Sequence, residues 1–229
     1  MNDVQADGLL PLGAEPFAFG RDADVYSLDE AWVVRRYRDG RPVRDEADFM
    51  RWVRKYDYPV PAVRQVEGPD IVLERLTGPT LADAAIAGDV SPVELGLIHA
   101  DLHRRLQAIP APSGTAGQVV VHGDLHPYNV ILTADGPVVI DWANAEEGPP
   151  EFDVAMTAII FAQVALDPAF ASLTPMLREA LATYLANSIN PTPGLDAALA
   201  SRGRNITLTP EELALLPAQA DLIRSHLPT

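Results

Sequence analysis

Two neighbouring stretches decide the fold of this chain: His122-Gly-Asp-Leu-His-Pro-Tyr-Asn129 and Val138-Val-Ile-Asp-Trp142. The first holds a loop carboxylate, Asp124, and ends in an amide, Asn129; the second contains another carboxylate, Asp141. Amide and carboxylate oxygens suit magnesium, which completes its shell with water and substrate phosphates. Together with a carboxylate that can accept a proton, this set predicts phosphoryl transfer from a nucleotide.

The residues between the two stretches predict a β-hairpin. Val130–Leu132 and 138–140 are short apolar runs separated by turn residues. A three-residue loop with Gly136 left-handed sets Asn129 opposite Asp141, whereas a two-residue turn shifts the register by one. Opposed residues lie about 4.5 to 5.5 Å apart and diagonal ones about 7 to 8 Å apart. In either register both side chains can reach one ion, so the open end of the hairpin predicts a metal clamp.

Asp124 is the candidate catalytic base. It lies in a segment whose glycine and proline interrupt regular structure. A loop aspartate there can face the acceptor and receive its hydroxyl proton, which is worth about 10²- to 10⁴-fold in rate. The alternative is that 122–124 and 127–129 are ordinary turns of a structural loop. The hairpin and Asp141 at the right spacing favour the chemical interpretation.

These residues resemble the catalytic and metal-binding signature of the aminoglycoside phosphotransferase family, small-molecule kinases that share the protein-kinase-like fold. The resemblance implies an α+β, two-lobed fold. A small N-terminal antiparallel sheet with one helix, residues 1–76, would bind the nucleotide, and a mainly helical lobe, residues 77–229, would hold the catalytic and acceptor sites. It further implies ATP, or another nucleoside triphosphate, and Mg²⁺ as cosubstrates. Asp124 would be the base, and Asn129 and Asp141 the metal ligands.

The same resemblance implies structural support for the catalytic loop. His122 and His126 would support it from within the signature. Asp153, in Glu151-Phe-Asp-Val-Ala155, is similar to the family's aspartate at the start of the next helix, which braces the loop through hydrogen bonds. A helix cap worth about 1 kcal/mol is an equally compatible interpretation of Asp153.

The N-terminal part predicts a paired carboxylate. Residues 31–37 form a β-branched and aromatic run typical of a strand, and 43–56 have the three-to-four apolar spacing of a helix. Glu46 falls inside that apolar stripe, where a carboxylate is costly unless it is paired. The preceding strand supplies Arg35 or Arg36 as its partner.

In the family's pattern, a strand lysine pairs with a helix glutamate and holds the inner phosphates, and Arg35 and Glu46 match these positions by spacing. Arginine departs from the pattern, but a guanidinium can contact both a carboxylate and a phosphate. The glycine-rich loop is reduced to one glycine, Gly20, within 19–26. The resemblance, which covers roughly residues 17 to 165, thus implies a nucleotide site with an altered phosphate-binding part.

Further elements follow in the expected order. Strands are predicted near 63–67 and 71–75. By its position in the resemblance, the segment from Glu74 to Leu76 would form the hinge that meets the adenine. Ser91 opens a helix to about residue 109 through a capping box. Later helices are predicted at about 151–166, 174–187 and 195–201, and a last one from Thr209.

Composition excludes several classes of function. The chain has 229 residues, 48% of them hydrophobic, and no cysteine, which suits one two-lobed domain without disulfides or a thiol nucleophile. The net charge of -15 argues against nonspecific nucleic-acid binding and favours slightly a cationic small-molecule acceptor. A start without basic residues and the lack of a long apolar run predict a cytoplasmic protein without a membrane span. Glu146, Glu147 and Asp167 could meet a cationic acceptor or be solvated acids.

Three alternatives remain to be weighed. His99 and His103, with His122 and His126, could be ligands of a zinc hydrolase, although the first two border an apolar helix stripe and suit packing. The thin glycine loop suggests a pseudokinase-like module that binds nucleotide without turnover, against which stands the intact catalytic trio. A protein kinase would need a longer segment than the ten or so residues after Asp141.

Overall fold

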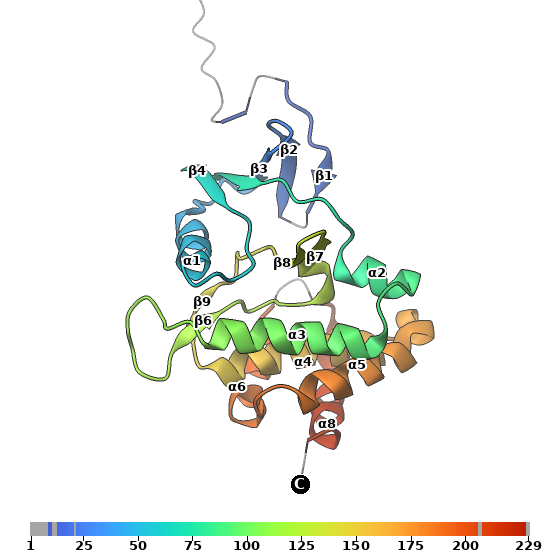
Figure 1. Cartoon of the computed structure of the whole chain (residues 1–229). Coiled ribbons are helices and arrows are strands. Elements are labelled where there is room, and N and C mark those ends of the chain that lie inside the picture. The colour runs from blue at the N-terminus through green and yellow to red at the C-terminus, as the bar shows by residue number, and fades with distance from the viewer. Residues whose placement is uncertain (1–8, 11–12, 21, 206–207, 228–229) are drawn as a thin grey trace, which may run out of the picture.

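A computed structural model describes residues 9–10, 13–20, 22–205 and 208–227. The expectation about the N-terminal residues 1–7 therefore lies outside the described part. One end of the molecule is an antiparallel sheet in the order β1-β2-β3-β5-β4, with α1 packed beneath it (Figure 1). The elements are β1 (Ala18–Phe19), β2 (Ala23–Ser27), β3 (Trp32–Tyr37), α1 (Arg44–Arg54), β4 (Val63–Glu67) and β5 (Asp70–Glu74).

Strand β3 places its side chains alternately on the two faces of this sheet. Val33 and Tyr37 belong to the main core, to which α1 also contributes. Val34 instead packs with Leu10 and Val72 in a small second cluster. Because successive strand residues face opposite sides, Arg35 lies on the same face as Val33 and Tyr37, which is the side of α1.

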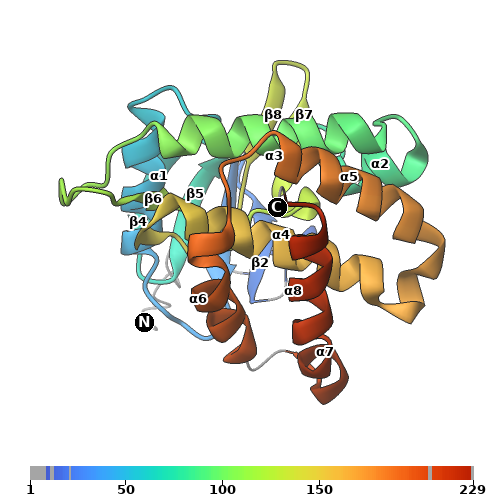
Figure 2. The same ribbon diagram turned by 90° about the horizontal axis from the view of Figure 1, so that it is seen from below.

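The other part of the molecule is mainly helical (Figure 2). Helix α4 is buried along most of its length and packs against its neighbours α5, α6 and α8. Ser91 caps α3 with the predicted capping box. The helices are α2 (Leu81–Ala87), α3 (Pro92–Gln107), α4 (Pro150–Leu166), α5 (Thr174–Ala186), α6 (Thr192–Gly203), α7 (Pro210–Ala214) and α8 (Leu216–Ser225), with 3-10 turns at Pro127–Asn129 and Pro168–Leu173.

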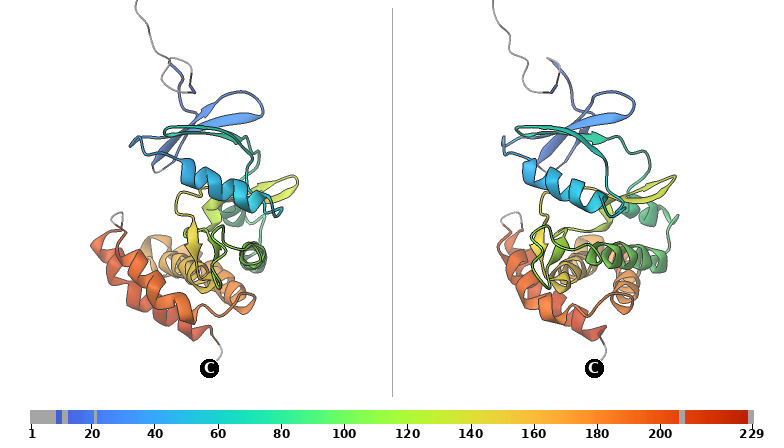
Figure 3. Two further views of the ribbon diagram at one scale, coloured as in Figure 1. Left: turned by 90° about the vertical axis from the view of Figure 1, so that its left-hand side faces the viewer. Right: turned by 60° about the vertical axis from the view of Figure 1, so that its left-hand side comes forward.

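Two short β-ribbons lie where the sheet and the helices meet. Strands β7 (Val130–Thr133) and β8 (Gly136–Val139) form the predicted hairpin, and β6 (Val119–Val121) pairs with β9 (Glu146–Gly148). Figure 3 shows the hairpin projecting between the sheet and the helical part. This arrangement confirms the α+β prediction of a small antiparallel sheet with one helix, followed by a mainly helical remainder.

The hairpin register distinguishes between the two turn lengths that the sequence allowed. Thr133 pairs with Gly136 across a two-residue turn, and Val130 pairs with Val139. The three-residue loop is therefore wrong, and the one-residue shift is right. Asn129 consequently lies opposite Ile140, whose N–H donates to the Asn129 carbonyl at 2.9 Å, and is diagonal to Asp141.

The C-terminal end also differs from prediction. The single helix expected from Thr209 is two helices, α7 and α8, which separate at Leu215. Pro217 explains the break, because proline lacks an N–H and its ring clashes with the preceding helical turn. Among the described residues, no single helix is long and apolar enough to cross a membrane; α4 and Pro168–Ala186, bent by 97°, meet that length and composition only as a pair.

Candidate active site

The buried carboxylate of Asp153 holds the backbone of the loop that carries Asp124. The backbone N–H groups of His122 and Gly123 donate to the two oxygens of Asp153, each at 2.8 Å. Asp153 is only 2% exposed. It is the fourth residue of α4, whose cap position is Pro149, so the helix-cap interpretation of Asp153 is wrong. Its contacts hold the loop backbone instead.

A second layer supports Asp153. His103 Nε2 lies 3.6 Å from an Asp153 oxygen, and the Tyr184 hydroxyl lies 3.1 Å from His103 Nδ1. Burial pushes the pKa of Asp153 up, but the neighbouring His103 and His122 outweigh it and hold that pKa below its usual value. Asp153 therefore stays an anionic acceptor for the loop.

His122 ties the loop to the strand end that carries Asp141. Its Nε2 donates to the Ile140 carbonyl at 3.0 Å, and its Nδ1 accepts from the Asp124 N–H at 3.3 Å. The ring is fully buried, and burial lowers its pKa. A neutral imidazole with one donor and one acceptor nitrogen fits both contacts. His126 lies on the outer side of the loop, with Nε2 at 3.7 Å from an Asp124 oxygen.

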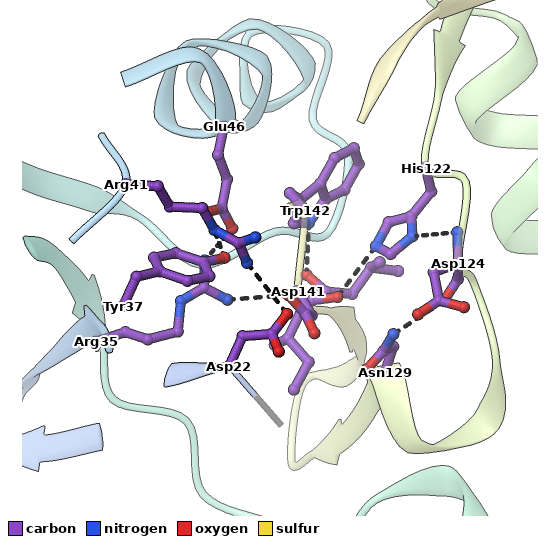
Figure 4. A network of polar contacts seen from close by, with 12 residues as sticks. Asp22, Arg35, Tyr37, Arg41, Glu46, His122, Asp124, Asn129, Asp141 and Trp142 are labelled. Atoms are coloured by element: carbon purple, nitrogen blue, oxygen red, sulfur yellow. Dashed lines mark hydrogen bonds and ion pairs between the residues drawn. The ribbon is translucent and has the colours of Figure 1, made fainter. Parts of the chain in front are cut away.

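Asn129 and Asp141 present oxygen atoms at the open end of the hairpin (Figure 4). Asn129 Nδ2 donates to the Asp124 carbonyl at 2.9 Å, which leaves the amide oxygen for a ligand. Asp141 has a φ of 61°, which is uncommon for a residue other than glycine, and its side chain is 48% exposed. The next residue, Trp142, is fully buried and donates from Nε1 to the Val139 carbonyl at 3.0 Å. The Asn129 amide oxygen and the Asp141 carboxylate suit a magnesium ion that also takes phosphate oxygens.

Arg35 joins the sheet to the strand end that carries Asp141. Its guanidinium forms an ion pair with Glu46, and Nη1 lies 3.3 Å from an Asp141 oxygen (Figure 4). Burial opposes the charge of Arg35, but the carboxylates of Glu46 and Asp141 outweigh it and raise the pKa of Arg35 above its usual value. Arg36 instead forms two hydrogen bonds to buried Asp70, at 2.6 and 2.7 Å. The structure therefore answers which arginine pairs with the helix carboxylate.

Tyr37 is a member of this cluster that the sequence analysis missed. Its hydroxyl donates to the second oxygen of Glu46 at 2.9 Å. The signal was available, because Tyr37 follows Arg35 by two residues in a strand and so shares its face. Burial raises the pKa of Tyr37 above its usual value, so the hydroxyl keeps its proton.

The remaining nucleotide-site candidates lie farther along the sheet. Gly20 occupies the turn between β1 and β2, and its N–H donates to the Ala23 carbonyl at 2.8 Å. Glu74 ends β5, and its side chain accepts from the Ala62 N–H at 3.0 Å. Leu76 follows that strand and is half-buried on the way to α2. These three residues do not join the Arg35 cluster, and the hinge role of the last two stays a prediction.

The histidines do not assemble a transition-metal site in the described part of the chain. His99 is fully buried, its Nδ1 donates to the Leu95 carbonyl at 3.0 Å, and burial lowers its pKa to about 3. Within those residues, no group of three or more histidine, cysteine, aspartate or glutamate side chains is placed to hold a metal. The zinc-hydrolase alternative therefore has no ligand cluster there.

Two of the three acidic candidates for acceptor binding have local structural partners. Glu147 accepts from the Ser113 backbone N–H at 2.9 Å and also from its hydroxyl. Asp167 accepts from the Ala169 N–H at 2.8 Å and caps the following 3-10 turn. Glu146, in β9, is exposed.

Comparison with known proteins places the chain in a family. Residues 13–114 and 81–186 match the phosphotransferase enzyme family, and the chain belongs to that family. The gentamicin complex of APH(2'')-IIa is similar with a TM-score of 0.57 and 15% identity, over 91% of this chain and 92% of that one. The ADP-bound aminoglycoside phosphotransferase APH(2'')-Ib has a TM-score of 0.56 and 14% identity, over 93% and 94%. These likenesses confirm the two-lobed fold.

One curated relative matches by sequence over a shorter span. A probable serine/threonine-protein kinase BUD32 homolog from Archaeoglobus fulgidus is 33% identical over 138 residues. The match covers 55% of this chain and 63% of that protein, so it extends over less than two thirds of the relative's length.

Proposed function

We propose that the protein transfers the γ-phosphate of ATP to a hydroxyl group of a small molecule with the help of Mg²⁺. The convergence of Asp124, Asn129 and Asp141 at the mouth of the hairpin supports this proposal, together with the Arg35 bridge from the sheet. In this proposal, residues 1–76 are the nucleotide-binding lobe and residues 77–229 the catalytic lobe.

Asp124 is the proposed base. The acceptor hydroxyl gives its proton to Asp124 while its oxygen forms a bond to the γ-phosphorus. The bond from that phosphorus to the β–γ bridging oxygen breaks, and ADP leaves. The carboxylate is partly exposed, at 27%, and its backbone is held by His122 and Asn129. A fixed backbone with an accessible side chain suits proton transfer from a bound ligand.

Asn129 and Asp141 are the proposed metal ligands, and Arg35, held by Glu46, the proposed phosphate ligand. A bound magnesium ion would neutralise phosphate charge during the transfer. Among the similar structures, one is a streptomycin–ATP complex of APH(2'')-IIa and another holds AMP-PNP and hygromycin B. They make ATP the first nucleotide to test here.

The acceptor is proposed to be a small molecule, with amine-bearing compounds as the first class to test. The net charge of -15 attracts cations at long range. Exposed Glu146 lies on β9, five residues after Asp141 in the chain. The segment from Asp141 to the start of α4 is short and partly paired in β9. It leaves little room for the switchable segment of a protein kinase.

The test is ATP-dependent phosphate incorporation into a panel of hydroxylated amines, aminoglycosides and metabolites. Asp124→Asn keeps the size of the side chain and is expected to lower turnover by about 10²- to 10⁴-fold, with ATP affinity nearly unchanged. Asp141→Asn is expected to weaken magnesium-dependent ATP binding as well. Asp135→Asn, in the exposed hairpin turn, removes one carboxylate of the same ribbon and serves as the matched control.

The outcomes separate the candidate functions. Wild-type turnover in Asp124→Asn would refute the assignment of the base. ATP binding by the wild type without transfer to any acceptor of the panel would favour the pseudokinase-like module, for which the single glycine of the phosphate loop and Arg35 are the motivating features.

A further inference from the structure

The single glycine of the glycine loop, Gly20, has no free N–H to offer a phosphate. Its N–H already donates across the β1–β2 turn to the Ala23 carbonyl. The carbonyl of Gly20 accepts from Arg38 at 3.0 Å. Loops that cover nucleotide phosphates do so with backbone N–H groups, and this glycine has committed its own. Binding of the phosphates should therefore depend more on cationic side chains.

Arg35 alone supplies little net positive charge. It contacts two carboxylates, Glu46 and Asp141, so the three groups together carry a formal charge of about -1 when all are ionised. A nucleoside triphosphate brings several further negative charges. Even with a divalent cation at Asp141, a second protein cation near the phosphates would offset more of their negative charge.

Arg41 is placed to be that cation (Figure 4). It lies in the connection between β3 and α1, and its guanidinium carbon is 4.1 Å from the centre of the Tyr37 ring. The guanidinium carbon of Arg35 is 5.2 Å from the same ring centre. The Tyr37 hydroxyl is bound to Glu46. The Tyr37 ring thus contacts both guanidinium groups and links Arg41 to the Arg35 cluster of the proposed phosphate site.

The carboxylate partners of Arg41 are exposed and can be exchanged. Nη2 lies 3.2 Å from an oxygen of Asp22, in the glycine-loop turn, and Nη1 lies 3.8 Å from Asp39. Asp22 and Asp39 are 54% and 58% exposed. Exposed ion pairs of this kind are weak, whereas a guanidinium binds phosphate through two parallel hydrogen bonds.

We propose that Arg41 binds the phosphates of the nucleotide and that Asp22 occupies its guanidinium until the nucleotide arrives. The inference rests on the proposed function, because it assumes that this site binds a nucleoside triphosphate. Arg41 takes over part of the role that backbone N–H groups play in a glycine-rich loop. Its Tyr37 platform limits the movement needed when phosphate replaces Asp22.

Opposite effects of two substitutions test the exchange. Calorimetric titration with MgATP and with adenosine gives the dissociation constants of each variant. Arg41→Gln is expected to weaken ATP binding by about 10-fold or more and to leave adenosine binding unchanged. Asp22→Asn removes the competing carboxylate and is expected to tighten ATP binding by about two- to fivefold. Arg51→Gln is the matched control, because Arg51 is equally exposed and is paired with Asp48 on α1.

A purely structural role of the Arg41–Asp22 pair predicts a different pattern. Both substitutions would then weaken ATP binding, and that result would overturn the inference, as would unchanged ATP affinity in Arg41→Gln. Arg41→Lys keeps the charge without the paired hydrogen bonds and is expected to fall between wild type and Arg41→Gln. Circular dichroism confirms that each variant is folded. Wild-type protein that binds ATP no better than adenosine would instead overturn the proposed function itself.

Discussion

The two sides of the candidate active site are built by different means. On the catalytic side, the backbone at His122 and Gly123 is fixed by buried Asp153, which is backed by His103 and Tyr184. On the proposed nucleotide side, the contacts join charged side chains, from the Arg35–Glu46 pair to the exposed Arg41–Asp22 pair. Buried hydrogen bonds fix the backbone on the first side. On the second side, ion pairs between side chains could be replaced by contacts with a ligand.

This difference has an energetic basis. A buried donor that loses its acceptor costs about 1 to 3 kcal/mol, whereas an exposed ion pair contributes about 0 to 1 kcal/mol. Substitutions on the catalytic side should therefore lower the free energy of unfolding. Substitutions on the nucleotide side should mainly change ligand affinity.

The largest expected effect comes from Asp153→Ala. The substitution leaves one buried and one partly buried N–H group without an acceptor and removes the carboxylate next to His103, and it is expected to lower the free energy of unfolding by about 3 to 5 kcal/mol. Urea denaturation measures the loss. Asp135→Ala, at the exposed hairpin turn, should change it by less than about 0.5 kcal/mol. A loss below about 1 kcal/mol in Asp153→Ala would show that the loop does not depend on this brace.

Glu46→Ala tests the nucleotide side at its most buried point. It leaves Arg35 and the Tyr37 hydroxyl without their shared acceptor, and the expected result is about 10-fold weaker ATP binding. Its cost in stability should be smaller than that of Asp153→Ala, at about 1 to 3 kcal/mol. ATP titration and urea denaturation of the same preparation separate the two effects. Asp48→Ala, on the exposed face of α1, is the control, and equal ATP affinity in Glu46→Ala would contradict the division between the two sides.

His99 makes the helical part sensitive to acid. Burial lowers its pKa from 6.5 to about 3 in the folded protein. Between these values the unfolded chain binds a proton that the folded chain does not, so the stability contributed by neutral His99 is lost progressively as the pH falls below about 6.5. His99→Leu removes this linkage and should make the fall in unfolding free energy from about pH 7 to 4.5 shallower.

The comparison needs a substitution in the same helix that removes no titratable group. Leu106→Ala, in the buried face of α3, should lower the unfolding free energy and leave its slope with pH as in the wild type. An unchanged slope in His99→Leu would mean that other groups, such as the Asp153 network, account for the acid sensitivity.

Local pattern was enough to predict one ion pair and one hairpin of the candidate site. The apolar stripe of α1 identified Glu46 as a carboxylate in need of a cation, and the structure supplies Arg35. The hairpin was predicted, but its register was not, because Ala134-Asp135-Gly136 is compatible with both turn lengths. A three-residue loop places Asp141 opposite Asn129, whereas a two-residue turn places Ile140 there. Only the folded structure distinguishes the two registers.

Contacts between distant segments could not be predicted in the same way. The pairing of β6 with β9 joins residues that are far apart in sequence, and neither strand is long enough to produce an alternating pattern. Helix α2 has only seven residues, which is too short for a clear helical period. The ring of Tyr37 beneath Arg41 depends on how the connection from β3 to α1 folds back over the strand, which no spacing rule specifies.

The smallest effect is expected for Gly20→Ala, in the residue that resembles the phosphate-loop glycine. A Cβ atom there would meet only the Ala23 carbonyl oxygen, at 3.1 Å, and the φ of Gly20 is not in the left-handed region. A change in stability below about 1 kcal/mol is therefore expected, with ATP affinity close to wild type because the Gly20 N–H is already bonded within the turn.

Gly78→Ala provides the contrast, since its φ is 148° and a Cβ atom would lie 1.9 Å from the Leu132 carbonyl oxygen. That variant should unfold more easily, whereas Gly20→Ala should not. Calorimetric titration with MgATP decides the remaining question. If Gly20→Ala removed ATP binding while Arg41→Gln did not, the backbone of the loop would be the main phosphate ligand, and the distinction between a backbone-built catalytic side and a side-chain-built nucleotide side would fail.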